Sequence, residues 1–308
     1  MKYSGIGGQA VIEGIMMKNR DRYATAVRKP DGEIAVMEGK YISMTEKVKF
    51  FSLPFVRGIF AFADSLILGM KTLAYSASFF EDEEESAPSP IEEKLQRIFG
   101  EKLEKAIISA SVVFSLLVSV AVFMLLPMFL SNLVKRFYNN YYLIAVLEGF
   151  LRIGIFVLYI KLVSRMEDIR RTFMYHGAEH KCINCVEHGL SLTVPNVMKS
   201  SKEHKRCGTS FLILVMMISI LFFMVLRVDT LWMRAISRIL LIPVIAGVSY
   251  EFLSLAGRSD FWLVNLLSRP GLWMQGLTTK EPTEDMVEVA IAAVERVFDW
   301  KRYLKENF

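Results

Sequence analysis

The chain has 308 residues, of which 53% are hydrophobic, and its mean hydropathy is +0.35. Soluble domains carry about 45–50% apolar residues, so this composition disfavours an ordinary soluble protein. The net charge is +5, and in a membrane protein the positive-inside rule and attraction to anionic lipid account for it without specific DNA binding. Three cysteines are too few for a disulfide framework, which excludes a disulfide-rich secreted domain.

Residues 1–45 are predicted to be rich in β-structure. The sequence Pro-Asp-Gly at 30–32 separates two short runs, and such a pattern predicts a hairpin because Pro presets φ while Gly supplies a positive φ. Met1 to Arg28 lacks a basic segment followed by an apolar one. We therefore expect no cleaved signal peptide, and we expect targeting by internal apolar spans.

Residues 50–80 are apolar but interrupted by charges such as Arg57 and Asp64. A spanning helix tolerates such charges poorly, so the pattern favours an amphipathic helix at the membrane interface, with an ordinary buried helix as the alternative. Residues 1–80 are thus expected to form a hairpin region followed by this helix. Residues 81–93 are acidic with two prolines, which is typical of a flexible linker.

Four apolar stretches in residues 94–256 predict a polytopic helical bundle. They cover 107–134, 141–163, 210–226 and 236–256. Each is close to the roughly 20 residues that a spanning helix needs. The predicted fold class is therefore mainly α: a helical membrane bundle of about four spans, with a small β-containing N-terminal cytoplasmic portion and cytoplasmic helices.

Lys and Arg concentrate in the loop at 164–209, between the second and third spans. The positive-inside rule predicts that this loop is cytoplasmic, and four spans then place both termini in the cytoplasm. After the last span, residues 257–282 form a polar segment. Residues 283–303 are predicted to close the chain as one amphipathic helix, because apolar side chains recur there at helical spacing.

Charged residues inside the predicted spans are functional candidates by default. Glu148 and Arg152 are one helical turn apart in the second span and can pair, so a structural ion pair is an equal alternative. Glu251 lies in the fourth span near its cytoplasmic end. It faces the same side as the loop at 164–209, which favours a functional role.

All the histidines and cysteines of the chain lie between residues 176 and 207. They are His176, His180, Cys182, Cys185, His188, His204 and Cys207. Imidazole and thiolate groups share one strong chemical use, which is to bind transition metals. The pattern therefore predicts a metal site in the cytoplasmic loop.

The sequence from His176 to His180 has the form His-x-x-Glu-His of the inverted zincins. If residues 168–188 are helical, both imidazoles lie on one face and can hold zinc, and Glu179 can act as the general base. A catalytic zinc keeps three protein ligands and one open position. Four residues are candidates for the third ligand: Glu187, His204, Cys207 and Glu251.

A second metal site competes with this one. Cys182 and Cys185, followed eighteen residues later by His204 and Cys207, have a spacing similar to a zinc ribbon. Four ligands would close that site and make it structural. The two interpretations cannot both use Cys207, and both remain open at this point.

Five blocks of the sequence resemble those of the YqhQ-like bacterial membrane proteins, over nearly the whole chain. They are GGQAVIEGIMM (7–17), HGAEHKCINC (176–185), HKRCGTSF (204–211), YEFLSLAGR (250–258) and PGLWMQGLTTKEP (270–282). That family has no known function and is labelled a predicted metal-dependent enzyme. The resemblance implies a multi-pass protein of the bacterial cytoplasmic membrane and a suspected metal, and it implies no substrate.

The resemblance also implies which residues belong to the family's motifs. They are His176, Glu179, His180, Cys185, His204 and Cys207. Cys182 departs from the motif, where threonine is expected, and this weakens the zinc-ribbon interpretation. Glu13, within the first block, is a further candidate for the site.

Three functions are compatible with these patterns. The first is a membrane-embedded, zinc-dependent hydrolase that acts on a peptide or a lipid-linked substrate at the inner face. The second is a non-enzymatic assembly factor that binds a nascent chain, the ribosome or a membrane partner through the basic loop. The third, a transporter that uses the charges within the spans, is disfavoured because four spans form a narrow pathway and no inverted repeat is visible.

Overall fold

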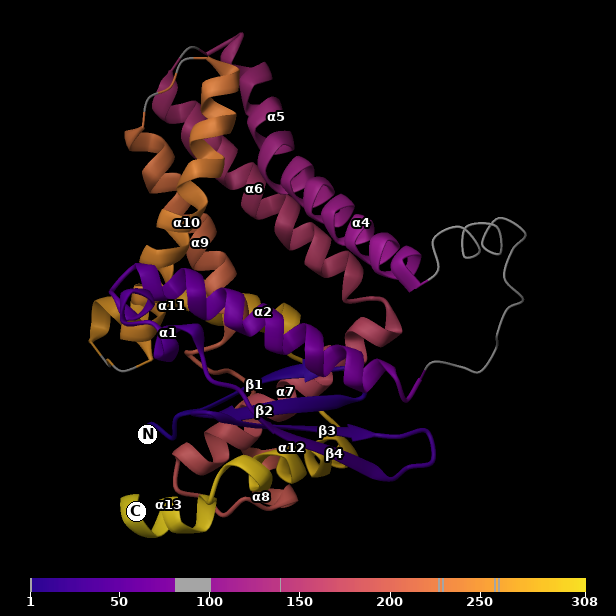
Figure 1. Cartoon of the computed structure of the whole chain (residues 1–308). Coiled ribbons are helices and arrows are strands. Elements are labelled where there is room, and N and C mark those ends of the chain that lie inside the picture. The colour runs from indigo at the N-terminus through magenta and orange to yellow at the C-terminus, as the bar shows by residue number, and fades with distance from the viewer. Residues whose placement is uncertain are drawn as a thin grey trace.

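The structure is a computed structural model that describes residues 2–80, 101–138, 140–226, 228, 230–257, 259 and 261–308. The linker expected at 81–93 lies outside these residues. The described chain is mainly helical, with a small antiparallel sheet near the N-terminus (Figure 1). It therefore confirms the predicted fold class.

The N-terminal sheet has four antiparallel strands in the order β1-β2-β3-β4. The strands are β1 (Ile6–Val11), β2 (Gly14–Asn19), β3 (Arg22–Arg28) and β4 (Ile34–Lys40). The hairpin predicted at Pro-Asp-Gly is confirmed, because Arg28 pairs with Ile34 and Gly32 has a φ of +88°. The β1–β2 hairpin turns at Glu13, whose φ is +46°, and the sequence analysis did not predict that turn.

Both faces of the sheet are covered by helices. Side chains such as Ile15 and Met17 pack with α7 (Glu167–Glu187) and α12 (Glu284–Val297) into the main core. On the other face, Met16 packs with Leu68 of α2 (Val56–Ala77). Successive residues of β2 thus alternate between two buried faces, as the strand geometry requires.

The predicted spans all form helices. Their bounds are α4 (Glu101–Val120), the π-helical turn η2 (Ala121–Leu125), α5 (Leu126–Lys135), α6 (Tyr141–Val163), α9 (Gly208–Val225) and α10 (Leu231–Ala256). The segment from α4 to α5 counts as one span. Within the described residues, five helices are long and apolar enough to cross a membrane: these four spans and α2, which is the least apolar.

The packing of the sheet bears on the placement of α2. The sheet, α7 and α12 pack together into one core. Figure 1 shows α2 lying crosswise between the sheet and the near ends of α9 and α10. The interfacial position expected for α2 stays a prediction, since α2 is also among the five helices that are long and apolar enough to cross a membrane.

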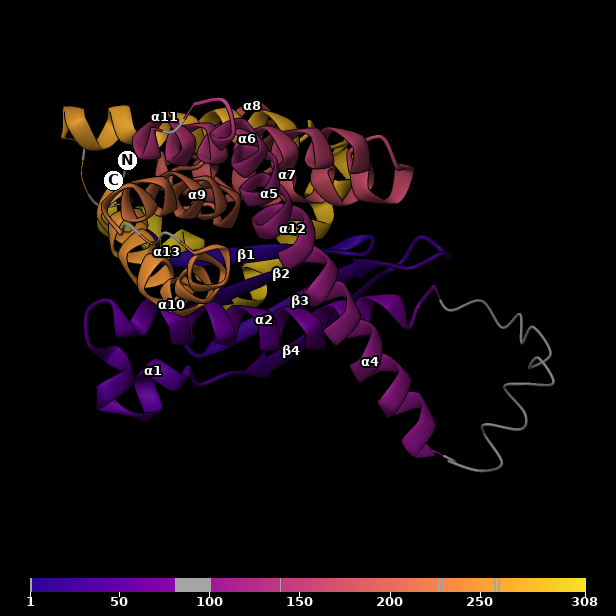
Figure 2. The same ribbon diagram turned by 90° about the horizontal axis from the view of Figure 1, so that it is seen from above.

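The remaining helices are short or lie after the last span. They are α1 (Met44–Lys47), the 3-10 turn η1 (Lys49–Ser52), α8 (Val194–Lys199), α11 (Trp262–Thr278) and α13 (Trp300–Asn307). Most of the segment at 257–282, which was predicted only to be polar, forms α11, and the sequence analysis did not predict this helix. The single helix predicted at 283–303 is wrong, since the chain breaks between α12 and α13. The two ends of the chain lie near each other, in the part of the molecule that contains the sheet (Figures 1 and 2).

Candidate metal centre

Helix α7 carries the two histidines of the His-x-x-Glu-His motif on one face. Their ring centroids are 4.4 Å apart, as expected for residues one turn apart. The helix begins with acidic residues and ends before Gly189, which has a φ of +82°. Acidic groups at a helix N-terminus and a glycine just beyond the C-terminus both stabilise a helix at these bounds. The local sequence therefore aligns His176 with His180.

Cys207 completes a group of three potential ligands. One ligand atom from each of His176, His180 and Cys207 lies within 4.8 Å of the other two, and Nε2 of His176 is 3.2 Å from Sγ of Cys207. Cys207 is the N-cap of α9, and its sulfur accepts a hydrogen bond from the backbone of Thr209. The group therefore lies where α7 meets the first turn of a membrane helix.

Backbone carbonyl groups orient both imidazole rings. Nδ1 of His176 is 3.0 Å from the carbonyl oxygen of Thr278, and Nδ1 of His180 is 2.7 Å from that of Lys202. A carbonyl oxygen can only accept, so each Nδ1 carries the proton and each Nε2 presents a lone pair. Ligating histidines in proteins are commonly held in this way.

Gln275 of α11 holds the segment that leads to Cys207. Its side chain is fully buried, accepts a hydrogen bond from the backbone N–H of His204 at 2.8 Å, and donates to the carbonyl oxygen of His204 at 2.7 Å. It also donates to the hydroxyl of Ser210 at 2.8 Å. The sequence analysis missed this residue. The signal that could have found it is its place in the sequence block at 270–282.

Glu179 lies beside the group of three but is not one of its members. It is buried, and its carboxyl group forms a hydrogen bond with the backbone of Gly8 in β1. Burial raises the pKa of Glu179, against the opposing effects of His176 and the Gly8 backbone. A Cβ at Gly8 would lie 3.0 Å from Cδ of Glu179, so the glycine permits this close approach. Through this contact, the sequence block at 7–17 lies next to the candidate metal centre.

Glu187 and His204 form a separate buried network. Oε2 of Glu187 is 3.5 Å from Nε2 of His204, and its other oxygen contacts Arg206 and accepts hydrogen bonds from Ser4. Burial alone would raise the pKa of Glu187. His204, Arg206 and Ser4 outweigh burial and lower that pKa to about 2. Burial lowers the pKa of His204, which Glu187 opposes. Neither residue belongs to the group of three.

Glu187→Gln is expected to lower the free energy of unfolding by about 3 kcal/mol near neutral pH, because the pKa falls from 4.5 to about 2 on folding. A lowered pKa stabilises the fold above the unfolded value, and the benefit is lost as pH falls toward 2. The unfolding temperature of wild type and variant in detergent should therefore converge with acidification. Glu203→Gln, at an exposed glutamate nearby, should have no effect. A difference that stays constant with pH would contradict this account.

The zinc-ribbon residues are not brought together. Cys182 and Cys185 lie in the apolar core between α7, α12 and the sheet, and burial raises the pKa of both thiols. Sγ of Cys185 is 3.4 Å from the carbonyl oxygen of Ser191. Only Cys207 of the predicted ribbon reaches the group of three, so Cys185 is not a ligand candidate in this arrangement.

The acidic candidates outside α7 have other partners. Glu13 contacts Arg171 of α7, with Oε2 at 2.6 Å from its guanidinium and 3.2 Å from the hydroxyl of Tyr175, and so docks the first hairpin. Glu251 contacts Arg57 with both carboxylate oxygens and joins α10 to α2. The position of Glu251 therefore disfavours it as a metal ligand.

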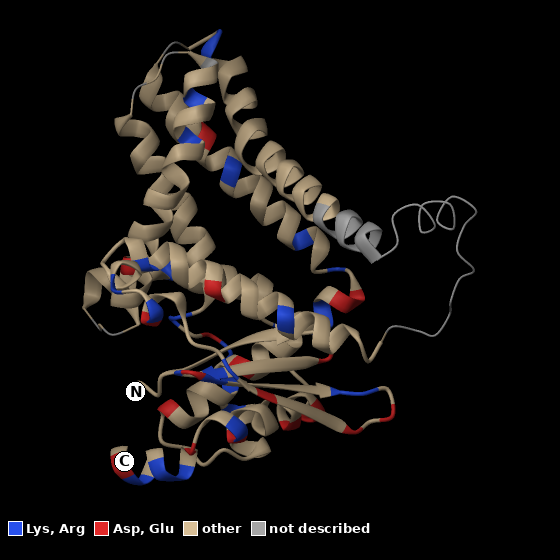
Figure 3. Ribbon diagram, viewed as in Figure 1, with Lys and Arg blue, Asp and Glu red and all other residues tan. Residues whose placement is uncertain are grey.

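Glu148 and Arg152 form the predicted ion pair, with 3.0 Å between the charged atoms. They lie in the part of the bundle remote from the sheet, where Figure 3 shows charged segments on neighbouring helices. They take no part in the group of three.

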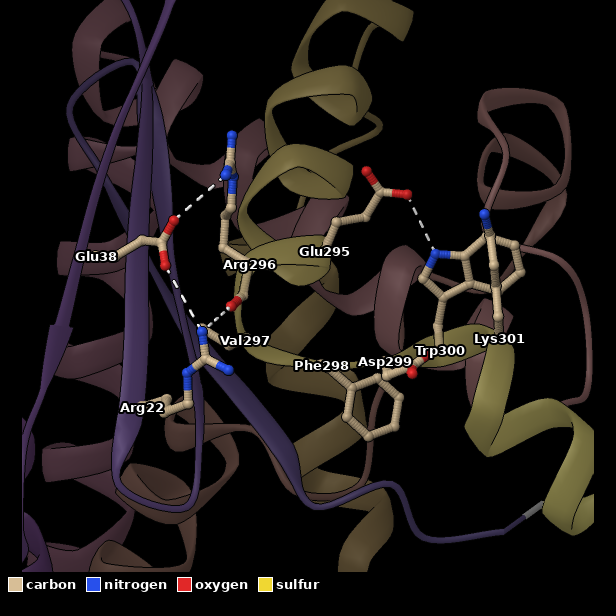
Figure 4. A pocket seen from close by; sticks show the side chains of 9 residues that line it. All are labelled: Arg22, Glu38, Glu295, Arg296, Val297, Phe298, Asp299, Trp300 and Lys301. Carbon is tan, nitrogen blue, oxygen red and sulfur yellow. Dashed lines mark hydrogen bonds and ion pairs between the residues drawn. The ribbon is translucent and has the colours of Figure 1, made fainter.

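A surface hollow lies away from the group of three, between the β3–β4 edge and the α12–α13 turn (Figure 4). Glu38 lies 3.7 Å from Arg22 and 3.4 Å from Arg296, and Trp300 donates a hydrogen bond to Glu295. These polar groups satisfy one another, so the hollow offers no set of convergent ligands.

The three side chains fit zinc. Imidazole nitrogen and thiolate sulfur are donors that zinc prefers, at about 2.0–2.1 Å and about 2.3 Å. The three ligand atoms lie within 4.8 Å of one another, and so surround one point at which a metal ion could be held. Three protein ligands leave one tetrahedral position open, which is the pattern of catalytic rather than structural zinc. His176 and His180 with Cys207 therefore form the candidate centre.

Comparison with known proteins identifies the family of the chain. A family model described as "Protein of unknown function (DUF1385)" matches residues 53–300. The chain belongs to this family. It is 37% identical over 305 residues to "Uncharacterized protein YqhQ" of Bacillus subtilis (strain 168), with 98% of this chain and 94% of the relative covered. The YqhQ-like resemblance is thus confirmed. No solved structure matches the chain.

Proposed function

We propose that the chain is a zinc-dependent enzyme of the membrane, with His176, His180 and Cys207 as the metal ligands. One observation carries this proposal. Two imidazoles with fixed Nδ1 protons present their Nε2 atoms beside a thiol from a different helix. Such convergence requires residues about 30 positions apart to meet, and apolar packing alone does not require donor atoms of this kind to meet.

The reaction class that fits best is hydrolysis. A bound zinc would supply Lewis-acid polarisation of the substrate and activation of water. Glu179, on the same face of α7 and next to His176, would accept a proton from that water. Burial of this carboxyl group keeps bulk water from competing for that proton. The centre lies where the helices of the sheet layer meet α9, and we propose that a peptide or lipid-linked substrate approaches it from the membrane surface.

The face that carries the centre is proposed to be cytoplasmic. The sheet, α7 and both chain ends lie on one side of the bundle, and the loop at 164–209 is the most basic. Basic loops remain in the cytoplasm during insertion. Free cysteines are also compatible with that reducing compartment.

Elemental analysis of the purified full chain tests the metal. We expect one zinc per chain in wild type and less than about a tenth of that in the His176→Ala, His180→Ala double variant. His188→Ala is the matched control, because His188 follows the same helix and bonds only to the carbonyl of Asn184 among the contacts described. Equal zinc in all three proteins would refute the proposed ligands.

Glu179→Gln separates catalysis from metal binding. We expect it to retain zinc, because Glu179 is outside the group of three, and to abolish complementation of a strain that lacks the gene. If zinc and complementation both survive, the enzyme proposal fails. A non-enzymatic assembly factor is then the better account, and salt-sensitive co-purification with a ribosome or membrane partner would support it.

A further inference from the structure

A second charged cluster lies in the membrane bundle, away from the candidate metal centre. Glu148 and Arg152 come from α6, and Arg234 and Arg238 come from α10. Glu148 contacts all three arginines. The exposed fractions of the side chains are 2% for Glu148, 9% for Arg152 and Arg234, and 4% for Arg238. One carboxylate thus faces three guanidinium groups in an apolar bundle.

The cluster has an excess of two positive charges among the described residues. Ser219 of α9 accepts a hydrogen bond from Arg152 at 2.7 Å. The ring centroid of Phe223 is 5.1 Å from the guanidinium carbon of Arg152 and 4.9 Å from that of Arg238. These neighbours carry no negative charge. Nε of Arg152 and Nη1 of Arg238 are buried and have no hydrogen-bond partner. Buried charges without compensation are costly in a membrane.

The three helices that form the cluster place their contributing residues at a similar depth in the bundle. Glu148 is seven residues from the start of α6, Ser219 is six residues from the end of α9, and Arg238 is seven residues from the start of α10. At about 1.5 Å per residue, each lies about 10 Å along the helix from the bundle end remote from the sheet. Arginine side chains at such a depth can extend toward the lipid headgroups.

We infer that this cluster binds a phosphate-type anion, with the phosphate of an anionic lipid headgroup as the source that its place in the bundle favours. Guanidinium groups match the geometry of phosphate oxygens, and two unpartnered N–H groups from different helices are available to donate. An anion would offset the two excess charges. The site is separate from the proposed zinc centre and goes beyond the proposed enzyme activity.

The test measures lipid binding by the purified full chain in a neutral detergent. Phosphatidylglycerol and phosphatidylcholine are titrated separately, with inorganic phosphate as a third arm, and bound lipid is counted by native mass spectrometry. We expect wild type to bind phosphatidylglycerol at least about tenfold more tightly than phosphatidylcholine. Arg238→Gln should weaken the phosphatidylglycerol affinity about tenfold to 100-fold, the effect of one lost charged hydrogen bond.

Glu148→Gln is the matched control. It disrupts the same ion-pair network but raises the excess positive charge, so phosphatidylglycerol binding should be retained or strengthened. A structural role alone would make both variants lose binding together. If inorganic phosphate saturates a site at the same residues, the inferred anion site is supported and free phosphate, rather than a lipid headgroup, is identified as the bound anion. If Arg238→Gln does not fold, the wild-type arms decide: equal affinity for both lipids and no response to phosphate overturn the inference.

Discussion

Gly177→Ala is expected to disrupt the candidate metal centre although it changes no ligand. A Cβ at Gly177 would lie 2.0 Å from the carbonyl oxygen of Lys280, whose N–H donates to Phe173 of α7 at 2.9 Å. Two residues earlier, the carbonyl oxygen of Thr278 holds Nδ1 of His176. The added methyl group must push this segment from α7, at a cost of about 1–3 kcal/mol. That cost exceeds the gain of up to about 1 kcal/mol in helix propensity.

The measurement for Gly177→Ala is the unfolding temperature in detergent together with zinc content. We expect both to fall, because the segment that moves also orients His176. Gly276→Ala is the control: it lies in neighbouring α11 with open space at its Cβ, so helix propensity should keep or raise stability. Gly177→Ala with wild-type zinc and an equal or higher unfolding temperature would show that the close approach does not matter.

The spans and the β3–β4 hairpin were predictable because their signals are local. Apolar stretches of spanning length identify membrane helices, and Pro-Asp-Gly at 30–32 fixes a turn through backbone geometry. The first hairpin carries no such signal, since Glu13 adopts a positive φ without being glycine. Helix α11 was missed because Pro270 and several polar residues interrupt its apolar pattern. Its buried face is stabilised by packing, for example of Met274 against Ile213 of α9.

The sequence narrowed the candidates for the metal ligands, but it did not decide between the two predicted zinc sites. The spacing of His176 and His180 predicted that they share a helix face, because helix geometry is regular. Whether Cys207 joins them or completes a ribbon depends on how α7 meets α9, and that contact is fixed by distant residues. Gln275 holds the backbone of His204, and Thr278 orients His176. None of these contacts leaves a periodic pattern in the sequence.

The location of the candidate centre follows from the same packing. Helix α7 lies in the layer under the sheet, whereas Cys207 begins a membrane helix and Thr278 ends α11. Three structural units therefore meet at one point, and each supplies a ligand or orients one. A site built in this way depends on the relative position of the sheet layer and the bundle, so binding of a metal should stabilise that junction.

Cys207→Ala is expected to abolish tight metal binding and thereby to separate the two predicted zinc sites. Loss of an outer partner of a zinc ligand costs about 10–100-fold in affinity, so loss of a ligand should cost more than that. Substitution of cobalt for zinc provides the measurement, because a sulfur ligand gives cobalt a charge-transfer absorption band. Wild type should show this band, and Cys207→Ala should lack it.

Cys182→Ala is the matched control, since Cys182 is buried in the apolar core and contributes no ligand to the group of three. The opposite pattern, in which Cys182→Ala loses the band and Cys207→Ala keeps it, would show that sulfur reaches the metal from the core. The arrangement at the junction of α7 and α9 would then not be the metal centre.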